Sequence, residues 1–180
     1  MSERSGELDP QVRLATQADI QQLAELQVEA WNEAYRGLMP DGFLAQQDPR
    51  QRATQWSNSL VNPAWFLLVA VSGPRVFGFC ALSPSRDPEP ESATGEIAAL
   101  YVHPLAWRKG YGKGLMRAAF KLARKQGYQR LTLWVLDTNQ PAREFYESQG
   151  FRLDGHTKNE AIPGGSLPHL RYVAKVPAAD

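Results

Sequence analysis

The fold of this 180-residue chain is decided by residues 108–115, Arg108-Lys109-Gly110-Tyr111-Gly112-Lys113-Gly114-Leu115. This stretch follows an apolar, strand-like run at 97–102 and opens a helix-like segment at 115–126. A strand that turns through glycines into a helix presents backbone N–H groups at a positive helix end, where phosphate oxygens bind. The sequence therefore predicts a phosphate-bearing ligand.

Two well-known nucleotide loops do not fit this stretch. The Walker pattern requires Ser or Thr after its lysine, whereas Lys113 is followed by Gly114. The dinucleotide fingerprint requires Gly-x-Gly-x-x-Gly after the first strand of a βαβ unit, with an acid about 20 residues further on. Here the glycines alternate, they lie past the middle of the chain, and residues 129–131 contain no acid.

Two other blocks point to one family. Leu100-Tyr101-Val102-His103-Pro104 followed by 108–112 resembles the acetyl-coenzyme A loop of the GNAT superfamily of N-acetyltransferases. Residues 139–151, with the sequence NQPAREFYESQGF, resemble a later motif of the same family: an Asn after a strand, a short helix carrying Tyr, and Gly-Phe entering the next strand. The resemblance extends over almost the whole chain, from Val12 to Val176.

The order of the expected elements predicts an α/β fold. Strand-like runs are joined first by a hairpin, between 65–71 and 76–82, and later by helices, which is typical of a mixed sheet. The resemblance implies one GNAT-like domain at 11–177, with a mostly antiparallel sheet of six to seven strands flanked by about four helices. Residues 1–10 are expected to form a flexible tail.

Composition excludes several classes of partner. The net charge of +1 gives no global field toward nucleic acid or a membrane surface, and no apolar run approaches the roughly 20 residues that span a bilayer. A single cysteine, Cys80, is compatible with a reducing cytoplasm, where we expect the protein to act. No metal-ligand cluster is visible. Sheet edges and exposed tryptophans are compatible with a homodimer.

The resemblance assigns the acetyl-CoA site. Strand residues Leu100, Tyr101 and Val102 would pair with the pantetheine arm, and the Val102 N–H would polarise the thioester carbonyl. Amides of the glycine stretch would hold the pyrophosphate: Arg108, Lys109, Gly110, Tyr111, Gly112 and Lys113. A tight turn without a ligand is the alternative. Trp107 departs from the family, which usually has Gln or Arg at this position. Asn139 would hydrogen-bond the cofactor or, equally well, cap the helix that contains Pro141.

The resemblance also assigns the catalytic groups. Tyr146 would protonate the departing thiolate; a phenol suits this role because it is neutral at pH 7. A half-buried tyrosine with a satisfied hydroxyl is the alternative. Glu96, at the start of the central strand, would take the proton of the acceptor amine directly or through water, although a surface glutamate is equally compatible with the sequence.

The acceptor side rests on residues 31–40, which resemble the first-helix and loop segment of a GNAT subgroup with poorly defined substrates. Trp31, Tyr35 and Arg36 would line the acceptor site, with core packing as the alternative for Trp31. The loop acids Asp87, Glu89 and Glu91 hint at a cationic substrate or form a solvated loop.

The sequence thus predicts an acetyl-CoA-dependent N-acetyltransferase that moves an acetyl group to a primary amine of a small molecule or peptide by direct attack. The resemblance leaves open a catalytically degenerate sensor that only binds acyl-CoA. A module that uses the basic face of 113–125 to bind RNA or an acidic protein is a third reading, which the small net charge disfavours.

Overall fold

The computed structural model describes residues 11–178, and the expected tail at 1–10 lies outside this range. The described residues form one seven-stranded sheet with the order β1-β2-β3-β4-β5-β7-β6. Its strands are β1 (Gln11–Leu14), β2 (Phe66–Ser72), β3 (Arg75–Pro84), β4 (Thr94–Val102), β5 (Arg130–Leu136), β6 (Arg152–Ile162) and β7 (Gly165–Lys175). Only β4 and β5 pair in parallel, so the prediction of a mixed, mostly antiparallel sheet is confirmed.

Within residues 11–178 the chain forms five α-helices, one more than expected. They are α1 (Ile20–Tyr35), α2 (Asp41–Leu44), α3 (Pro49–Val61), α4 (Tyr111–Lys125) and α5 (Gln140–Ser148). Short 3-10 turns occur at Gln17–Asp19 and Pro104–Ala106. None of the helices in this part of the chain is long and apolar enough to cross a membrane.

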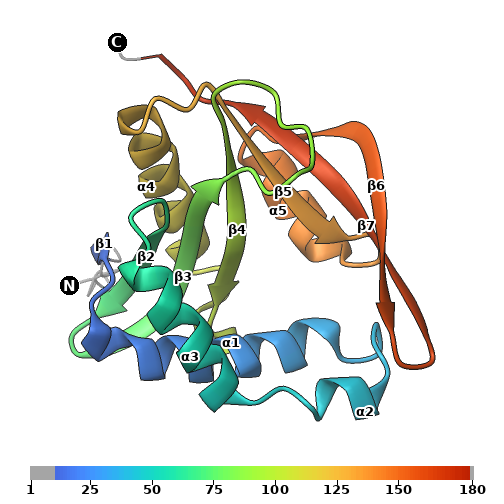
Figure 1. Cartoon of the computed structure of the whole chain (residues 1–180). Coiled ribbons are helices and arrows are strands. Elements are labelled where there is room, and N and C mark those ends of the chain that lie inside the picture. The colour runs from blue at the N-terminus through green and yellow to red at the C-terminus, as the bar shows by residue number, and fades with distance from the viewer. Residues whose placement is uncertain (1–10, 179–180) are drawn as a thin grey trace, which may run out of the picture.

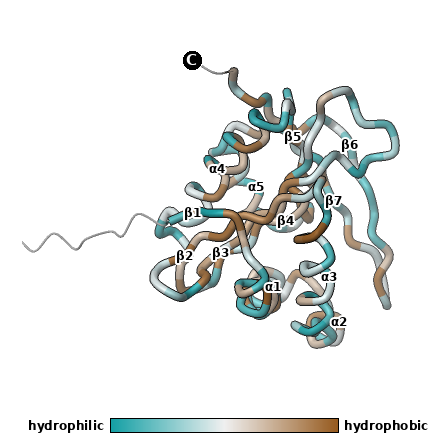
Figure 2. Tube along the Cα trace, turned by 60° about the vertical axis from the view of Figure 1, so that its left-hand side comes forward, coloured by the Kyte–Doolittle hydropathy of each residue, from teal (hydrophilic) through white to brown (hydrophobic). Residues whose placement is uncertain are grey.

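The helices cover the sheet in two layers (Figure 1). Helices α1 and α3 pack on one face, over alternate residues of β2 and β3 such as Val69 and Phe79. Helix α4 packs on the other face, where Leu115 and Ala119 belong to one buried cluster with Cys80 and Leu133. The hydrophobic colour in Figure 2 accordingly follows the central strands between the helices. We call the α1/α3 side the acceptor face.

Helix α4 begins four residues earlier than the sequence pattern predicts, at Tyr111 instead of Leu115. The turn itself ends at Gly110, whose φ of +85° is left-handed and therefore favours glycine. Gly112 and Gly114 thus belong to the first turn of the helix. The sequence misplaced this boundary because glycine is a poor helix former. In the structure the absence of a side chain at Gly112 leaves room for Phe145 and Val102.

The parallel pair β4–β5 stays together for only three residue pairs, Thr94↔Arg130, Gly95↔Leu131 and Glu96↔Thr132. Beyond Glu96 the two strands diverge, as Figure 1 shows below the middle of the sheet. Strand β5 continues along β7 as far as Leu136, and β4 continues along β3 as far as Val102. The carboxyl-terminal half of β4 is therefore a free strand edge in the centre of the sheet.

Candidate active site

The exposed half of β4 is the first component of the site. Residues Thr94 to Ile97 are buried, whereas the five residues from Ala98 to Val102 are only half-buried, although this strand lies at the centre of the sheet. The His103 N–H donates to the Phe77 carbonyl, and in an antiparallel ladder the backbone groups alternate in direction. The N–H groups of Leu100 and Val102 consequently point away from β3, toward the diverging β5. A strand-like ligand could pair with them there.

The amino-terminal end of α4 is the second component. The N–H groups of Tyr111, Gly112 and Lys113 belong to the first turn of a helix, so they have no partner within the helix. A Cβ on Gly112 would lie 3.3 Å from Cζ of Phe145 in α5 and 3.7 Å from Cγ2 of Val102. Glycine thus lets the start of α4 approach both α5 and the end of β4, which places the helix amides beside the free strand edge.

Trp107 ties these two components together. Its indole Nε1–H donates to the Val102 carbonyl oxygen at 2.7 Å, across the turn between β4 and α4. The departure from the family pattern therefore has a structural role that the sequence did not indicate. Arg108 and Lys109 follow on the same turn with exposed side chains, and Arg108 has a left-handed φ of 60°.

Tyr146 lies on α5, where Phe145 and Phe151 pack against its ring at centroid distances of 5.5 and 6.0 Å. Burial raises the pKa of Tyr146 well above its usual value, and the neighbouring Tyr35 and Cys80 raise it further. The phenol therefore keeps its proton at neutral pH. Burial also raises the pKa of a thiol in the same core: the pKa of Cys80 is about 12.

Three tyrosines from three elements converge at this point. Burial raises the pKa of Tyr101 well above its usual value, and Tyr35 and Tyr146 raise it further. Burial also raises the pKa of Tyr35, and a side-chain hydrogen bond with Asn139 lowers it in part. Trp31 stacks obliquely on Tyr35, with ring centroids 4.6 Å apart. The structure thus brings α1, the end of β4 and α5 to one place.

Two further predicted residues have other partners. Asn139 is buried and its Oδ1 caps α5 by accepting from the Ala142 N–H at 3.3 Å, so its capping role is present. Arg36, the C-cap residue of α1, is exposed, and its guanidinium pairs with Glu33 at 2.8 Å. Of the predicted acceptor residues, the structure gathers Trp31 and Tyr35 but not Arg36.

Glu96 is not a surface glutamate, since its side chain is only 2% exposed. Its Oε1 accepts from the Arg86 guanidinium at 2.5 and 3.2 Å, and its Oε2 accepts from the Arg86 backbone N–H at 2.9 Å. It lies on β4 at the last residue pair before the strands diverge.

Comparisons with known proteins place this geometry in a family. The profile of the Acetyltransferase (GNAT) family matches residues 21–151, which include both the turn before α4 and helix α5. The chain belongs to the GNAT acetyltransferase family.

Individual relatives of this GNAT protein extend over most of its length. "Probable N-acetyltransferase Rv2775" of Mycobacterium tuberculosis is 27% identical over 165 residues, 89% of this chain and 91% of its own. "Uncharacterized N-acetyltransferase YuaI" of Bacillus subtilis is 27% identical over 137 residues, 76% of this chain and 77% of its own. The structure of yncA from Salmonella typhimurium with acetyl-CoA superposes with a TM-score of 0.72, 18% identity, and coverage of 95% and 96%. The chain is an N-acetyltransferase, and acetyl-CoA is its acetyl donor.

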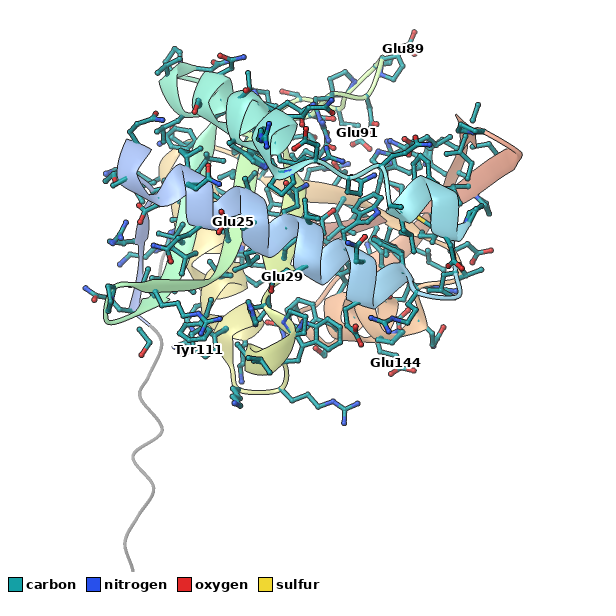
Figure 3. All side chains as sticks on the ribbon, turned by 90° about the horizontal axis from the view of Figure 1, so that it is seen from below. Glu25, Glu29, Glu89, Glu91, Tyr111 and Glu144 are labelled. Carbon is teal, nitrogen blue, oxygen red and sulfur yellow. The ribbon has the colours of Figure 1, made fainter. Side chains whose placement is uncertain are left out.

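The residues of this GNAT site suit acetyl-CoA. The half-exposed edge of β4 offers backbone groups to the extended pantetheine arm. Because Gly112 has no Cβ, the first turn of α4 can lie close to the end of this edge, where its amides can meet the diphosphate. Tyr111 and Glu144 mark the two helices that flank this end in the view from below (Figure 3). Among residues 11–178, no group of three or more His, Cys, Asp or Glu side chains could hold a metal ion.

The acidic loop of this GNAT protein does not offer the free negative charge that the sequence hinted at. Asp87 accepts from Trp134 at 3.0 Å and from Arg171 at 2.7 Å, and Glu91 pairs with Arg130. Glu89 points outward at the end of the loop (Figure 3). The ion pairs of Asp87 and Glu91 fix the loop onto β5 and β7.

Sequence reasoning missed several groups of the GNAT acceptor face. Gln27 accepts from Trp56 at 2.6 Å and also hydrogen-bonds Tyr101. Arg52 of α3 lies with its Cζ 5.9 Å from the centroid of the Trp31 ring and lowers the pKa of Tyr101 against the effect of burial. Neither residue belongs to the two motifs that carried the resemblance. The only sequence signal for Gln27 and Arg52 was that each is a polar residue within an amphipathic helix, α1 and α3 respectively.

Proposed function

We propose that the protein transfers the acetyl group of acetyl-CoA to a primary amine of a small molecule or peptide by direct attack, without a covalent enzyme intermediate. The observation that carries the proposal is the half-exposed end of β4, which lies beside the first-turn amides of α4 and near α5, the helix that contains Tyr146. Bound there, acetyl-CoA supplies the thioester carbonyl carbon on which the amine acts.

Backbone groups bind and orient the donor in this proposal. The amides from Arg108 to Lys113 hold the diphosphate at the positive end of α4, with Lys113 adding a charge. Leu100, Tyr101 and Val102 hold the pantetheine arm along the free edge of β4. The Val102 N–H points toward this edge and stabilises negative charge that develops on the carbonyl oxygen. Holding both reactants in line supplies much of the rate.

Tyr146 gives its proton to the sulfur as the carbon–sulfur bond breaks. Its raised pKa makes the phenol a weak acid in water, but a thiolate that leaves in the same buried surroundings is desolvated as well. Cys80 illustrates the size of this effect on a thiol, with a pKa of about 12. The two shifts oppose one another, so the proton transfer depends on position more than on acidity.

Glu96 receives the proton that the attacking amine loses. The guanidinium of Arg86 donates to Oε1 of this buried carboxylate and forms an ion pair with it. The second oxygen accepts a single backbone N–H, so it can accept one further hydrogen bond. The proposal therefore assigns the amine proton to a water that bridges to Oε2.

An acetyl-transfer screen tests the function. Purified protein and acetyl-CoA are mixed with pools of small amines, amino acids, peptides with free amino termini, lysine peptides and aminoglycosides, and the released thiol is measured. Thiol release that depends on one pool supports the proposal. Binding of acetyl-CoA by calorimetry without release in any pool would instead indicate a sensor that only binds the acyl donor.

A further inference from the structure

We infer that the acceptor carries a carboxylate as well as the amine, and that Arg52 binds this carboxylate. The inference rests on the proposed acetyl transfer and names the substrate class of the same site. Its occupant would be an amino acid or a similarly small amino-carboxylate.

Arg52 lies on the acceptor face near the place where chemistry is proposed. Its guanidinium is 5.9 Å from the centroid of the Trp31 ring, and it lowers the pKa of Tyr101. The Trp31 ring in turn lies near two of the clustered tyrosines, with its centroid 4.6 Å from that of Tyr35 and 6.3 Å from that of Tyr101. The Trp31 ring thus lies near both the guanidinium and the tyrosines beside which acetyl transfer is proposed.

The guanidinium of Arg52 contacts only neutral oxygens. It donates to Oε1 of Gln47 at 2.7 Å and to Oε1 of Gln55 at 3.2 Å. Among residues 11–178 it forms no salt bridge, whereas Arg86 on the same face pairs with Glu96. The two glutamines hold the planar fork in a fixed direction without neutralising it. A fixed guanidinium of this kind suits a carboxylate, which it can bind through two parallel hydrogen bonds.

A second donor lies next to this guanidinium. The indole Nε1 of Trp31 is buried and has no hydrogen-bond partner among the described residues. An unpaired buried N–H group is unfavourable, and an acceptor oxygen that reached it would recover that free energy. A lone cation could be a solvated surface group, but a cation beside an unpaired N–H donor favours an anionic ligand.

The carboxylates of the acceptor face argue in the same direction. Asp87 and Asp154 both bind Arg171, each at 2.7 Å, and Glu96 binds Arg86, so these acids are not free to receive a second positive charge on the acceptor. Glu160 is the acid that acts on Tyr35, but its side chain is 60% exposed and lies 3.9 Å from His169. Polyamines and aminoglycosides therefore find less complementary charge here than an amino acid does.

Matched acceptor pairs test the inference directly. Phenylalanine is compared with phenethylamine, tyrosine with tyramine, and lysine with cadaverine, with spermidine as a polycation. The kcat/KM of each acid should exceed that of its decarboxylated partner by about tenfold or more, because a charge-assisted hydrogen bond typically contributes the free energy of a factor of ten or more. Equal or higher values for the amines would overturn the inference while leaving acetyl transfer intact.

Variants identify the residue responsible. Arg52→Gln should reduce the acid-to-amine ratio of kcat/KM by about tenfold, mainly through the KM of the acid, and Arg52→Lys should restore part of it. Arg50→Gln is the matched control, because Arg50 is an exposed arginine two residues earlier on the same helix, and the ratio should stay as it is. An unchanged ratio in Arg52→Gln would contradict the inference. Failure to acetylate any amine, despite binding of acetyl-CoA, would remove the proposed function and this inference together.

Discussion

The indole N–H of Trp107 donates to the backbone carbonyl of Val102, so that a side chain of the turn closes onto the end of the strand that precedes it. Most of the donor site consists of backbone groups, and their positions depend on how this turn is held. The bond joins the two parts that must act together, the free edge of β4 and the amino-terminal end of α4.

Replacing Trp107 by Phe keeps an aromatic ring and removes the hydrogen bond. We expect the Kd for acetyl-CoA, measured by calorimetry, to rise about two- to tenfold, because one hydrogen bond contributes roughly 1 kcal/mol and here holds the binding groups in place. Leu105→Ala is the control, since Leu105 is 67% exposed in the same turn. Tighter binding in Trp107→Phe would show that the indole competes with the ligand for the Val102 carbonyl.

Tyr146→Phe removes the proposed acid and retains the ring that packs on Phe145 and Phe151. We expect kcat to fall by about 10²- to 10⁴-fold, the usual contribution of a positioned general acid, and the Kd for acetyl-CoA to stay nearly constant. Tyr128→Phe is the same chemical change at the far end of β4, where Tyr128 lies against Gly95, and should leave kcat unaffected. Full turnover in Tyr146→Phe would assign the proton to another group.

The pH profile of the natural enzyme gives a second test of Tyr146. An acid works in its protonated form, and burial raises the pKa of this phenol, so activity should not decline between pH 7 and pH 9.5 because of Tyr146. Activity should instead rise over this range as the acceptor amine loses its proton. A decline centred below pH 9 in the kcat profile would indicate a different acid.

The sequence predicted those parts of the fold that depend on local pattern. The glycine-containing turn before α4, the helix that carries Tyr146 and the apolar runs of β2 and β3 each follow from a few neighbouring residues, and the structure has all of them. Local pattern and motif order were sufficient for the frame of the site.

The pairs that fix polar side chains could not be predicted in this way. Arg86 and Glu96 lie ten residues apart across a loop, and Asp87 and Arg171 lie 84 residues apart in sequence. Their meeting depends on how the loop after β3 folds over β5 and β7, which no periodicity in the sequence encodes. For the same reason the acidic loop suggested free charge, although Asp87 is committed to an ion pair.

Gly112→Ala separates binding from stability. The added Cβ would lie 3.3 Å from Cζ of Phe145, which is tighter than most such contacts, and would push α4 away from α5. Alanine is also the better helix former by about 1 kcal/mol, which offsets the strain in the free energy of unfolding. We therefore expect little change in stability by urea titration, but an acetyl-CoA Kd raised by about tenfold.

Two further variants give this experiment its controls. Gly42→Ala in α2 adds a Cβ with no atom within 4 Å, so stability should rise by about 0.5 to 1 kcal/mol and the Kd should not change. Gly112→Ala combined with Phe145→Leu relieves the contact and should restore part of the affinity. An unaltered Kd in the single variant would mean that the close approach of α4 to α5 is not needed for binding.

Asp19 provides a prediction about stability and pH. Its carboxylate accepts two hydrogen bonds from Arg13, at 2.7 and 2.9 Å, and one from the Thr16 N–H at 2.8 Å. The hydrogen bonds from Arg13 are the main reason that its pKa falls from 3.8 to about 2. A carboxyl group that is more acidic in the folded state stabilises the fold above its unfolded pKa, and this stabilisation is lost as the pH falls toward 2.

Asp19→Asn should therefore unfold more easily than the natural protein at pH 6, by an amount on the order of 1 to 2 kcal/mol once the partial exposure of Arg13 is allowed for. The difference between the two proteins should shrink as the pH is lowered from 4 to 2, since the natural carboxylate then becomes protonated. Urea titrations at several pH values measure it, with Glu25→Gln on the exposed side of α1 as the control. A difference that stayed constant down to pH 2 would mean that Asp19 acts by packing and capping geometry, and not through its charge.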